Sequence, residues 1–188
     1  MAELSAVLAA RRSIRRYRPD PVPPEVLARV WEGARLAPSW ANGQPVTFIL
    51  IRDQATKNRL AELSAPEEYI RSRHRQQGYW RNPARRALSE APLVVAAVAD
   101  PRRSGALWGM DFYLVDAGIV MSHLFLAAQN EGLGTCYVGV YHEALVKEIL
   151  GVPEPYRVVG LSPLGYPAES PSARPRKELS DLVKEERF

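Results

Sequence analysis

The chain has 188 residues, 46% hydrophobic and 24% charged, a composition that suits one folded domain and excludes general disorder. Its one cysteine, Cys136, excludes an intrachain disulfide framework and any metal site built from several cysteines. The first residues lack the basic and apolar pattern of a signal peptide. The most apolar stretch, residues 112–128, contains Asp116, Ser122 and His123, and we expect it to be too short and too polar to span a bilayer. These features predict a soluble cytoplasmic protein.

The net charge is +4, and arginine supplies 21 of the 25 basic residues. The arginines are clustered, with five in residues 11–18 and six in residues 71–86. Such clusters are typical of sites that neutralise phosphate, either in a nucleic acid or in a phosphate-bearing cofactor. A solvated basic surface is the third interpretation, and the sequence leaves it open, above all for residues 71–86.

Hydrophobic periodicity and turn signals divide the chain into short elements. Helices are predicted over residues 2–12, 24–37, 56–63, 110–131 and 142–150. Strands are predicted over residues 46–51, 92–99, 134–140 and 157–164. A proline-rich linker over 17–24, a loop over 39–45, a polar and basic segment over 66–90 and a polar tail from residue 168 complete the chain. This imperfect alternation indicates one α/β or α+β layered structure.

Two runs of the sequence are similar to common catalytic or cofactor-binding motifs but do not match them. The run that starts at Gly132 carries Tyr137 where the dinucleotide fingerprint needs its third glycine, and it precedes a predicted strand. The run from Gly160 to Gly165 is one residue too long for a nucleophile elbow. Cys136 falls inside a predicted strand, which favours a buried structural cysteine over a nucleophile. The sequence therefore indicates neither a catalytic triad nor a metal site.

Three segments have the composition expected around an anionic, planar ligand. Residues 11–15 (RRSIR) combine guanidinium groups with a serine hydroxyl, both of which bind phosphate. Residues 38–45 (PSWANGQP) place Ser, Asn and Gln between two prolines, which also fits a simple polar turn. Residues 174–177 (RPRK) form a basic patch in the tail.

In this order the segments resemble the FMN-dependent nitroreductase family. The similarity is carried by RRSIRRYRPDPVPPEVLARVWEGARLAPSWANGQPVTFILIRD, DAGIVMSHLFLAAQNEGLGTCYVGVY, LSPLGYPAE and RPRKELSDLV. Residues 64–109 match no block of the family. The resemblance implies an α+β nitroreductase-like fold with a small mixed, mainly antiparallel sheet flanked by helices. It also implies an obligate homodimer with the long central helix at the interface.

The resemblance further implies a single FMN-binding domain over residues 1–188. Residues 64–109 would form a variable lid or acceptor segment, and the tail over 167–188 would wrap the partner subunit. Each flavin would draw on both subunits. The residues implied to bind the cofactor are Arg11, Arg12, Ser13, Arg15, Ser39, Asn42, Gln44, Tyr137, Val138, Gly139, Arg174 and Arg176. The aromatic residues expected to line the acceptor pocket are Trp40, Tyr79, Trp80 and Trp108.

The activity implied is an oxidoreductase that moves hydride from NADH or NADPH through flavin N5 to a nitroaromatic, a quinone or a related small-molecule acceptor in a ping-pong cycle. No protein nucleophile and no metal is needed, since the flavin carries the chemistry. One alternative is a same-fold flavin enzyme of another branch, either a reductive dehalogenase or an oxygen-dependent flavin-cleaving enzyme. A more distant alternative is a basic nucleic-acid-binding protein without catalysis. Under the leading interpretation we expect no nucleic-acid partner and no membrane partner.

Overall fold

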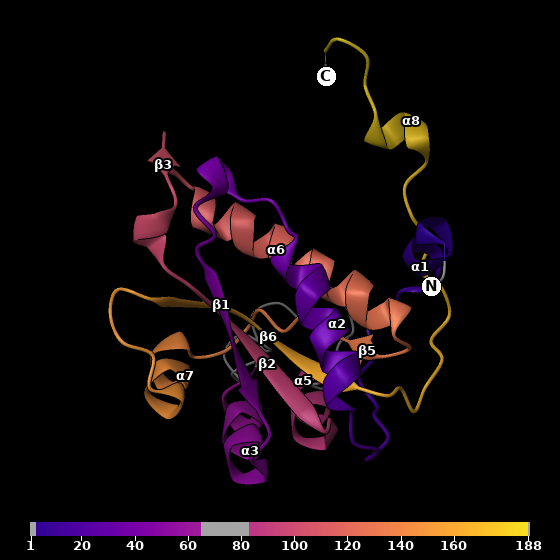
Figure 1. Ribbon diagram of the computed structural model, residues 1–188. Helices are drawn as coiled ribbons and strands as arrows, with labels where there is room; N and C mark the ends of the chain where they lie inside the picture. Colours follow the sequence, from indigo (N-terminus) through magenta and orange to yellow (C-terminus); the bar gives the residue numbers. More distant parts are fainter. Residues whose placement is uncertain (1–2, 65–82, 188) are drawn as a thin grey trace, which may run out of the picture.

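The computed structural model describes residues 3–64 and 83–187. Its helices and strands follow the chain in the order shown in Figure 1. The helices are α1 (Leu4–Ala10), α2 (Pro24–Arg35), α3 (Gln54–Leu63), α5 (Pro83–Glu90), α6 (Phe112–Asn130), α7 (Glu143–Leu150) and α8 (Leu179–Leu182), with short 3-10 turns η1 (Trp40–Asn42) and η2 (Pro101–Arg103). The strands are β1 (Val46–Ile51), β2 (Leu93–Ala99), β3 (Ala106–Leu107), β4 (Met110–Asp111), β5 (Gly134–Thr135) and β6 (Arg157–Gly165).

The main sheet has the order β1-β2-β6-β5, and all its neighbouring strands are antiparallel. A parallel bridge between Ser13 and Thr135 joins the N-terminal segment to its edge. Helices α2 and α6 cover one face of the sheet, and α3, α5 and α7 cover the other (Figure 1). The predicted α+β class with a small mixed, mainly antiparallel sheet is confirmed.

Strand β2 shows why a continuous apolar run forms the centre of this sheet. All seven of its residues are buried. Leu93 and Val95 pack into the cluster under α2 and α6, whereas Val94, Ala96 and Val98 pack into the cluster under α3, α5 and α7. A strand buried on both faces has no polar side and therefore no alternation. Strand β2 lies inside the predicted acceptor segment, residues 64–109. Because β2 is buried, only the other residues of that segment could contact an acceptor.

The predicted strand over residues 134–140 was wrong in extent. Strand β5 ends at Thr135, and pairing with β6 returns only where Val138 and Leu161 exchange backbone hydrogen bonds of 2.8 and 2.9 Å. Beyond the Val138–Leu161 bridge, the Tyr137 hydroxyl donates to the Val159 carbonyl at 2.6 Å, so a side chain supplies the donor at that carbonyl of β6. The hydrophobic pattern of the sequence does not show where the backbone pairing of two strands is interrupted.

Other boundaries shifted for local reasons. Helix α3 begins at Gln54 because the Asp53 carboxylate accepts the Thr56 N–H and caps the helix. Helix α6 begins at Phe112, two residues later than expected, because Met110–Asp111 pair with Ala106–Leu107 in a small hairpin. Its turn residues, Trp108 and Gly109, both have positive φ values, 50° and 81°, as a tight two-residue hairpin requires.

Helix α6 is, by length and composition alone, long and apolar enough to cross a membrane, so the expectation that this stretch is too short and too polar was wrong. The same test is passed by the central helix of a folded domain. Here α6 packs against α1, α2 and the strands of the main sheet. These contacts identify it as that central helix.

Candidate cofactor site

A basic cavity forms where the N-terminal segment meets the C-terminal tail. Its volume is about 440 Å³. The predicted site residues that line it are Arg11, Arg12, Ser13, Arg15, Arg174 and Arg176. Among the residues that the structure describes, no acidic side chain lines this cavity. Six of the implied cofactor ligands, from opposite ends of the sequence, therefore lie around one space.

Backbone pairing holds the two segments together. Arg18 N–H donates to the Tyr166 carbonyl and Ala168 N–H donates to the Arg16 carbonyl, both at 2.9 Å. The Glu169 carboxylate accepts the Arg15 N–H at 2.6 Å. The tail thus begins as a partner of the N-terminal segment, which brings residues 171–176 beside the end of α1 (Figure 1).

Arg12 is the most constrained of the cavity arginines. Its Nη1 atom donates to the Ala9 carbonyl at 2.7 Å and to the Arg11 carbonyl at 2.9 Å. Its Nε atom is buried and has no hydrogen-bond partner within residues 3–64 and 83–187. A buried donor without a partner is costly, so the described part of the chain leaves this guanidinium incompletely satisfied.

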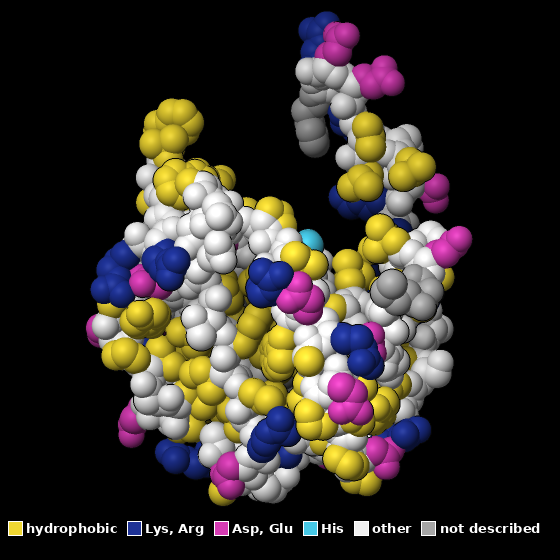
Figure 2. All heavy atoms as spheres, viewed as in Figure 1, with side chains coloured by type: hydrophobic (Ala, Val, Ile, Leu, Met, Phe, Trp, Pro, Cys, Tyr) yellow, Lys and Arg dark blue, Asp and Glu magenta, His cyan; other side chains and the backbone are white. Residues whose placement is uncertain are grey.

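A second, flatter cavity continues from the first, since Arg11 and Ser13 line both. Its volume is about 570 Å³. One wall is helix α6, through Leu114, Ala117, Gly118, Met121, Ser122 and Phe125, and the opposite wall is Thr135, Cys136, Tyr137 and Val159. Figures 1 and 2 show the exposed side of α6 lying open between the β3 hairpin and α1. A cavity with a cationic end and an apolar body fits a planar ligand that carries an anionic group.

Tyr137 lines this second cavity, and two nearby glycines leave space for its ring. A Cβ atom on Gly139 or Gly160 would lie 2.7 Å from the Tyr137 ring, so the two glycines make room for the ring. Partial burial raises the pKa of the Tyr137 hydroxyl, which stays protonated near neutral pH. Val138 is buried in the core and belongs to the lining of neither the basic nor the flatter cavity.

Cys136 lies just beyond β5 and not inside a strand as predicted, but it is buried, with 5% of its surface exposed. Burial raises the pKa of its thiol, and the nearby Arg15 lowers it to a lesser extent. The neutral thiol that results is a poor nucleophile. The structure therefore favours the structural interpretation of this residue.

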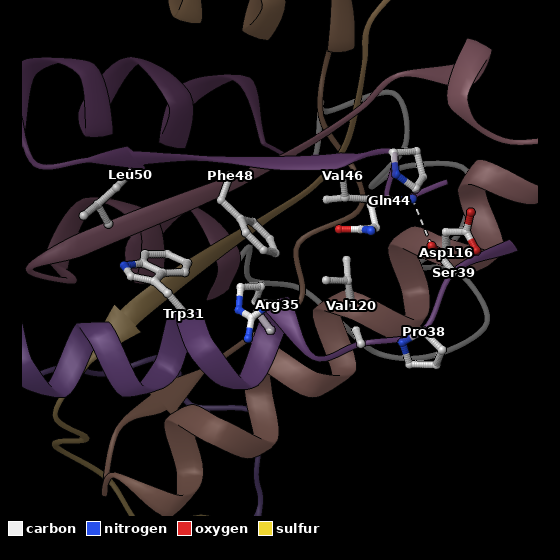
Figure 3. A pocket seen from close by; sticks show the side chains of 13 residues that line it. Trp31, Arg35, Pro38, Ser39, Gln44, Val46, Phe48, Leu50, Asp116 and Val120 are labelled. Carbon is white, nitrogen blue, oxygen red and sulfur yellow. Dashed lines mark hydrogen bonds between the residues drawn. The ribbon is translucent and has the colours of Figure 1, made fainter. Parts of the chain in front are cut away.

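The loop with Ser39, Asn42 and Gln44 faces a different cavity of about 460 Å³ between α2, β1 and α6 (Figure 3). Ser39 and Gln44 line it, and the Ser39 hydroxyl accepts the Gln44 N–H at 2.9 Å. Asn42 Oδ1 accepts Gln44 Nε2 at 3.1 Å. Within one chain the structure does not bring this loop to the basic cavity.

Sequence reasoning missed Asp116, which also lines this third cavity (Figure 3). Its carboxylate accepts the Trp40 N–H and the Ser104 hydroxyl, each at 2.8 Å. The available signal was an acidic residue within a largely apolar helix. By itself this signal marks only a polar interruption of a hydrophobic stretch.

The predicted acceptor aromatics lie apart from these cavities or outside the described residues. Trp40 is half-exposed and stacks on Phe112, with ring centroids 5.9 Å apart. Trp108 is 95% exposed at the tip of the β3–β4 hairpin. Tyr79 and Trp80 fall outside the described residues. Within residues 3–64 and 83–187, no group of three or more His, Cys, Asp or Glu side chains could hold a metal ion.

Comparison with known proteins gives a consistent result. The pattern of the nitroreductase family matches residues 8–166. An NADH dehydrogenase of Thermus thermophilus is 31% identical over 92% of this chain and 91% of its own length. A 5,6-dimethylbenzimidazole synthase of Rhodospirillum rubrum is 30% identical over 95% of this chain and 87% of its own length.

Solved structures agree with the sequence comparisons. A nitroreductase family protein of Clostridium novyi has a TM-score of 0.79 and 32% identity, covering 92% of this chain and 89% of its own. An FMN-dependent nitroreductase of Clostridium difficile has a TM-score of 0.76 and 26% identity, covering 97% and 98%. The chain belongs to the nitroreductase family and is an oxidoreductase of that family.

Proposed function

We propose that this protein is an FMN-dependent oxidoreductase that takes hydride from NADH or NADPH and passes it to a small electron acceptor such as a nitroaromatic or a quinone. The observation that carries the proposal is the basic cavity, where five arginines converge and, among the described residues, neither an acidic side chain nor a partner for the buried Arg12 Nε is found. A phosphate monoester supplies the missing charge and acceptors, because guanidinium groups bind phosphate oxygens in pairs. A relative described as FMN-dependent supports this choice of cofactor.

In this proposal Arg11, Arg12, Arg174 and Arg176 hold the phosphate, and the Ser13 hydroxyl adds a neutral hydrogen bond. The adjoining cavity beside α6 and Tyr137 has the apolar body that a flavin ring needs. When bound, FMN would supply two-electron transfer at its N5 atom. The protein's own contribution is then binding, orientation and electrostatics. Arg15 places a cation next to this cavity, which favours the anionic reduced state of the ring.

We also propose a homodimer in which the loop with Ser39, Asn42 and Gln44 completes the site of the other copy. One chain leaves this loop and the basic cavity separate. The exposed side of α6 carries Leu114 and Val115, and a Cβ atom on Gly118 would meet no described atom within 4 Å. An exposed apolar helix face of this kind is typical of a subunit interface. The exposed apolar tail residues Leu179, Leu182 and Val183 fit a tail that wraps the partner.

The proposed acceptor is a small molecule of the nitroaromatic or quinone class. We propose that the variable segment, residues 64–109, contacts the acceptor, and that the exposed Trp108 is one of its contacting side chains. A soluble, cytoplasmic enzyme without nucleic-acid or membrane partners is part of the same proposal.

A second candidate follows from the relative named 5,6-dimethylbenzimidazole synthase. That product contains the dimethyl-substituted benzene ring that also forms one end of a flavin. The identity to this relative is 30%, against 31% for the NADH dehydrogenase, so sequence similarity does not separate the two. The flavin-cleaving branch is therefore kept as the alternative activity of this fold.

The visible absorption spectrum of the purified protein tests the proposal, before and after anaerobic addition of NADH or NADPH. Flavin bands that bleach on addition support the proposed activity. Flavin bands that stay unbleached support the alternative branch, in which a separate reductase supplies the electrons. A colourless protein that cannot be reconstituted with FMN, and that binds nucleic acid in a salt-sensitive manner, overturns both.

A further inference from the structure

Asp116 connects two segments that are distant in the sequence. It lies on α6 with 3% of its surface exposed. Its Oδ1 atom accepts the backbone N–H of Trp40 and its Oδ2 atom accepts the Ser104 hydroxyl, each at 2.8 Å. A buried carboxylate needs hydrogen-bond donors for both of its oxygens. The segments that contain Trp40 and Ser104 each supply one of these donors. Neither the proposed binding of phosphate nor the proposed chemistry uses it.

The first segment, residues 38–45, has an unfavourable backbone. Ala41, Asn42 and Gln44 have φ values of 46°, 55° and 46°, in the left-handed region that residues other than glycine rarely adopt. Several such residues in one loop persist only where the surroundings determine their conformation. This loop carries the three residues proposed to reach the flavin ring.

Contacts with residues 103–112 hold the loop in this conformation. Arg103 Nε donates to the Gly43 carbonyl at 3.0 Å. A Cβ atom on Gly43 would lie 1.9 Å from the Arg103 carbonyl oxygen, and one on Gly105 would lie 2.9 Å from the Trp40 ring. Trp40 also stacks on Phe112. The loop and the start of the β3–β4 hairpin are thus packed as one unit, and Asp116 hydrogen-bonds both parts.

We propose that Asp116 is a positioning residue that fixes the conformation of the loop with Ser39, Asn42 and Gln44, and thereby the contacts of these side chains with the flavin ring. The inference rests on the proposed function. It predicts that the carboxylate affects the environment of the ring, while the phosphate is held by arginines in a separate cavity.

Two substitutions separate positioning from charge. Asp116→Ala removes both hydrogen bonds. Asp116→Asn keeps both, since its carbonyl oxygen accepts the Trp40 N–H and its amide donates to the Ser104 hydroxyl, which can donate or accept. Asp53→Ala is the matched control: the Asp53 carboxylate also accepts one backbone N–H and one hydroxyl, both from Thr56, at 2.7 and 2.8 Å. Asp53 lies beyond the opposite end of β1 from the loop.

The experiment measures, for each variant reconstituted with FMN, the visible flavin spectrum, the midpoint potential and steady-state NAD(P)H oxidation. We expect Asp116→Ala to retain FMN, to shift the flavin bands and the midpoint potential, and to lower kcat by about 10-fold to 100-fold, as misplacement of about 1 Å does. We expect Asp116→Asn and Asp53→Ala to retain the wild-type spectrum and potential. An Asp116→Ala protein with the wild-type spectrum, potential and kcat overturns the inference.

Ser104→Ala keeps the inference testable if Asp116→Ala does not fold, because it removes only the bond to Oδ2. We expect a smaller shift in the same direction, and an unchanged spectrum and potential would count against the positioning role. Failure of the proposed function is distinguishable, since the wild-type protein would then bind no FMN or its flavin would not be reduced by NAD(P)H.

Discussion

The backbone N–H of Arg15 donates a hydrogen bond of 2.6 Å to a carboxylate oxygen of Glu169, 154 residues further along the chain. This bond joins the segment after α1 to the start of the C-terminal tail. Because arginines of the basic cavity come from both segments, the shape of the proposed phosphate site depends on their junction. Glu169 is the last residue of the segment LSPLGYPAE, to which the sequence analysis assigns no site role, and its contact with Arg15 emerges only from the fold.

Removal of this carboxylate tests the junction. We expect Glu169→Ala to destabilise the protein by about 1–3 kcal/mol, since a half-buried donor loses a charged acceptor, and to weaken FMN binding by about 10-fold. Glu169→Gln retains an acceptor oxygen and should weaken binding less. Quenching of FMN fluorescence gives the affinity, and urea denaturation gives the stability. Equal affinity in all three proteins would show that the junction does not shape the site.

The arginines themselves are tested by Arg11→Ala combined with Arg176→Ala. Each lost charge-assisted hydrogen bond is worth about 1.5–3 kcal/mol, so we expect FMN affinity to fall by at least about 100-fold. The remaining affinity should also depend less on salt concentration, because fewer charges attract the phosphate. The measurement is the same fluorescence titration at several ionic strengths.

Arg52→Ala combined with Arg59→Ala is the matched control for that pair. It removes the same charge from exposed positions that line neither the basic cavity nor its neighbour. Full flavin occupancy in the Arg11 and Arg176 double variant, with or without change in the control, contradicts the proposed phosphate site.

The packing of Tyr137 on Gly160 gives a prediction about stability. A Cβ atom at position 160 would lie 2.7 Å from the Tyr137 ring. The ring is half-exposed and can swing outward, but it then loses the hydrogen bond to the Val159 carbonyl. We expect Gly160→Ala to cost about 1–3 kcal/mol. In the Tyr137→Ala background the same substitution should cost clearly less, because the clash is gone.

Denaturation of the two single variants and the double variant measures this coupling. Additive free energies of unfolding would show that the ring does not rest on Gly160. Tyr137→Phe serves as the reference that removes only the hydroxyl.

The Glu143–Arg157 pair predicts a pH dependence. Arg157 donates to both carboxylate oxygens at 2.8 Å, and these hydrogen bonds hold the pKa of Glu143 below its ordinary range. With a lowered folded-state pKa, the unfolded chain binds the proton first as the pH falls. The stabilisation is therefore complete above an unfolded-state pKa of about 4.3 and is lost as the pH falls through the lower folded-state value.

We expect Glu143→Gln to be less stable than the wild type at pH 7 and to approach it in stability at pH 3. Free energies of unfolding measured from pH 7 to pH 3 check this. A difference between the two proteins that stays constant, or grows toward acid, contradicts the assignment of this pair.

Local sequence determined most of the fold. The boundaries of β1 coincide with those predicted, and those of β2 differ by one residue, because short, mostly apolar runs with β-branched residues, each preceded by a proline, are typical of strands. Gly151 directly follows the helix predicted over residues 142–150, and it ends α7 in the left-handed conformation with φ of 64°. The family was indicated by the resemblance of four sequence segments, and the match of the family pattern to residues 8–166 confirmed it.

Only the tertiary structure decided which side chains meet. It placed Arg174 and Arg176 beside Arg11, it brought the Tyr137 hydroxyl to the Val159 carbonyl, and it gave Asp116 its two partners. Each of these facts depends on residues between about 12 and 165 positions apart, and periodicity carries information over only a few residues. Local patterns determine helices and strands, whereas a site is built from long-range contacts that form when the layers pack.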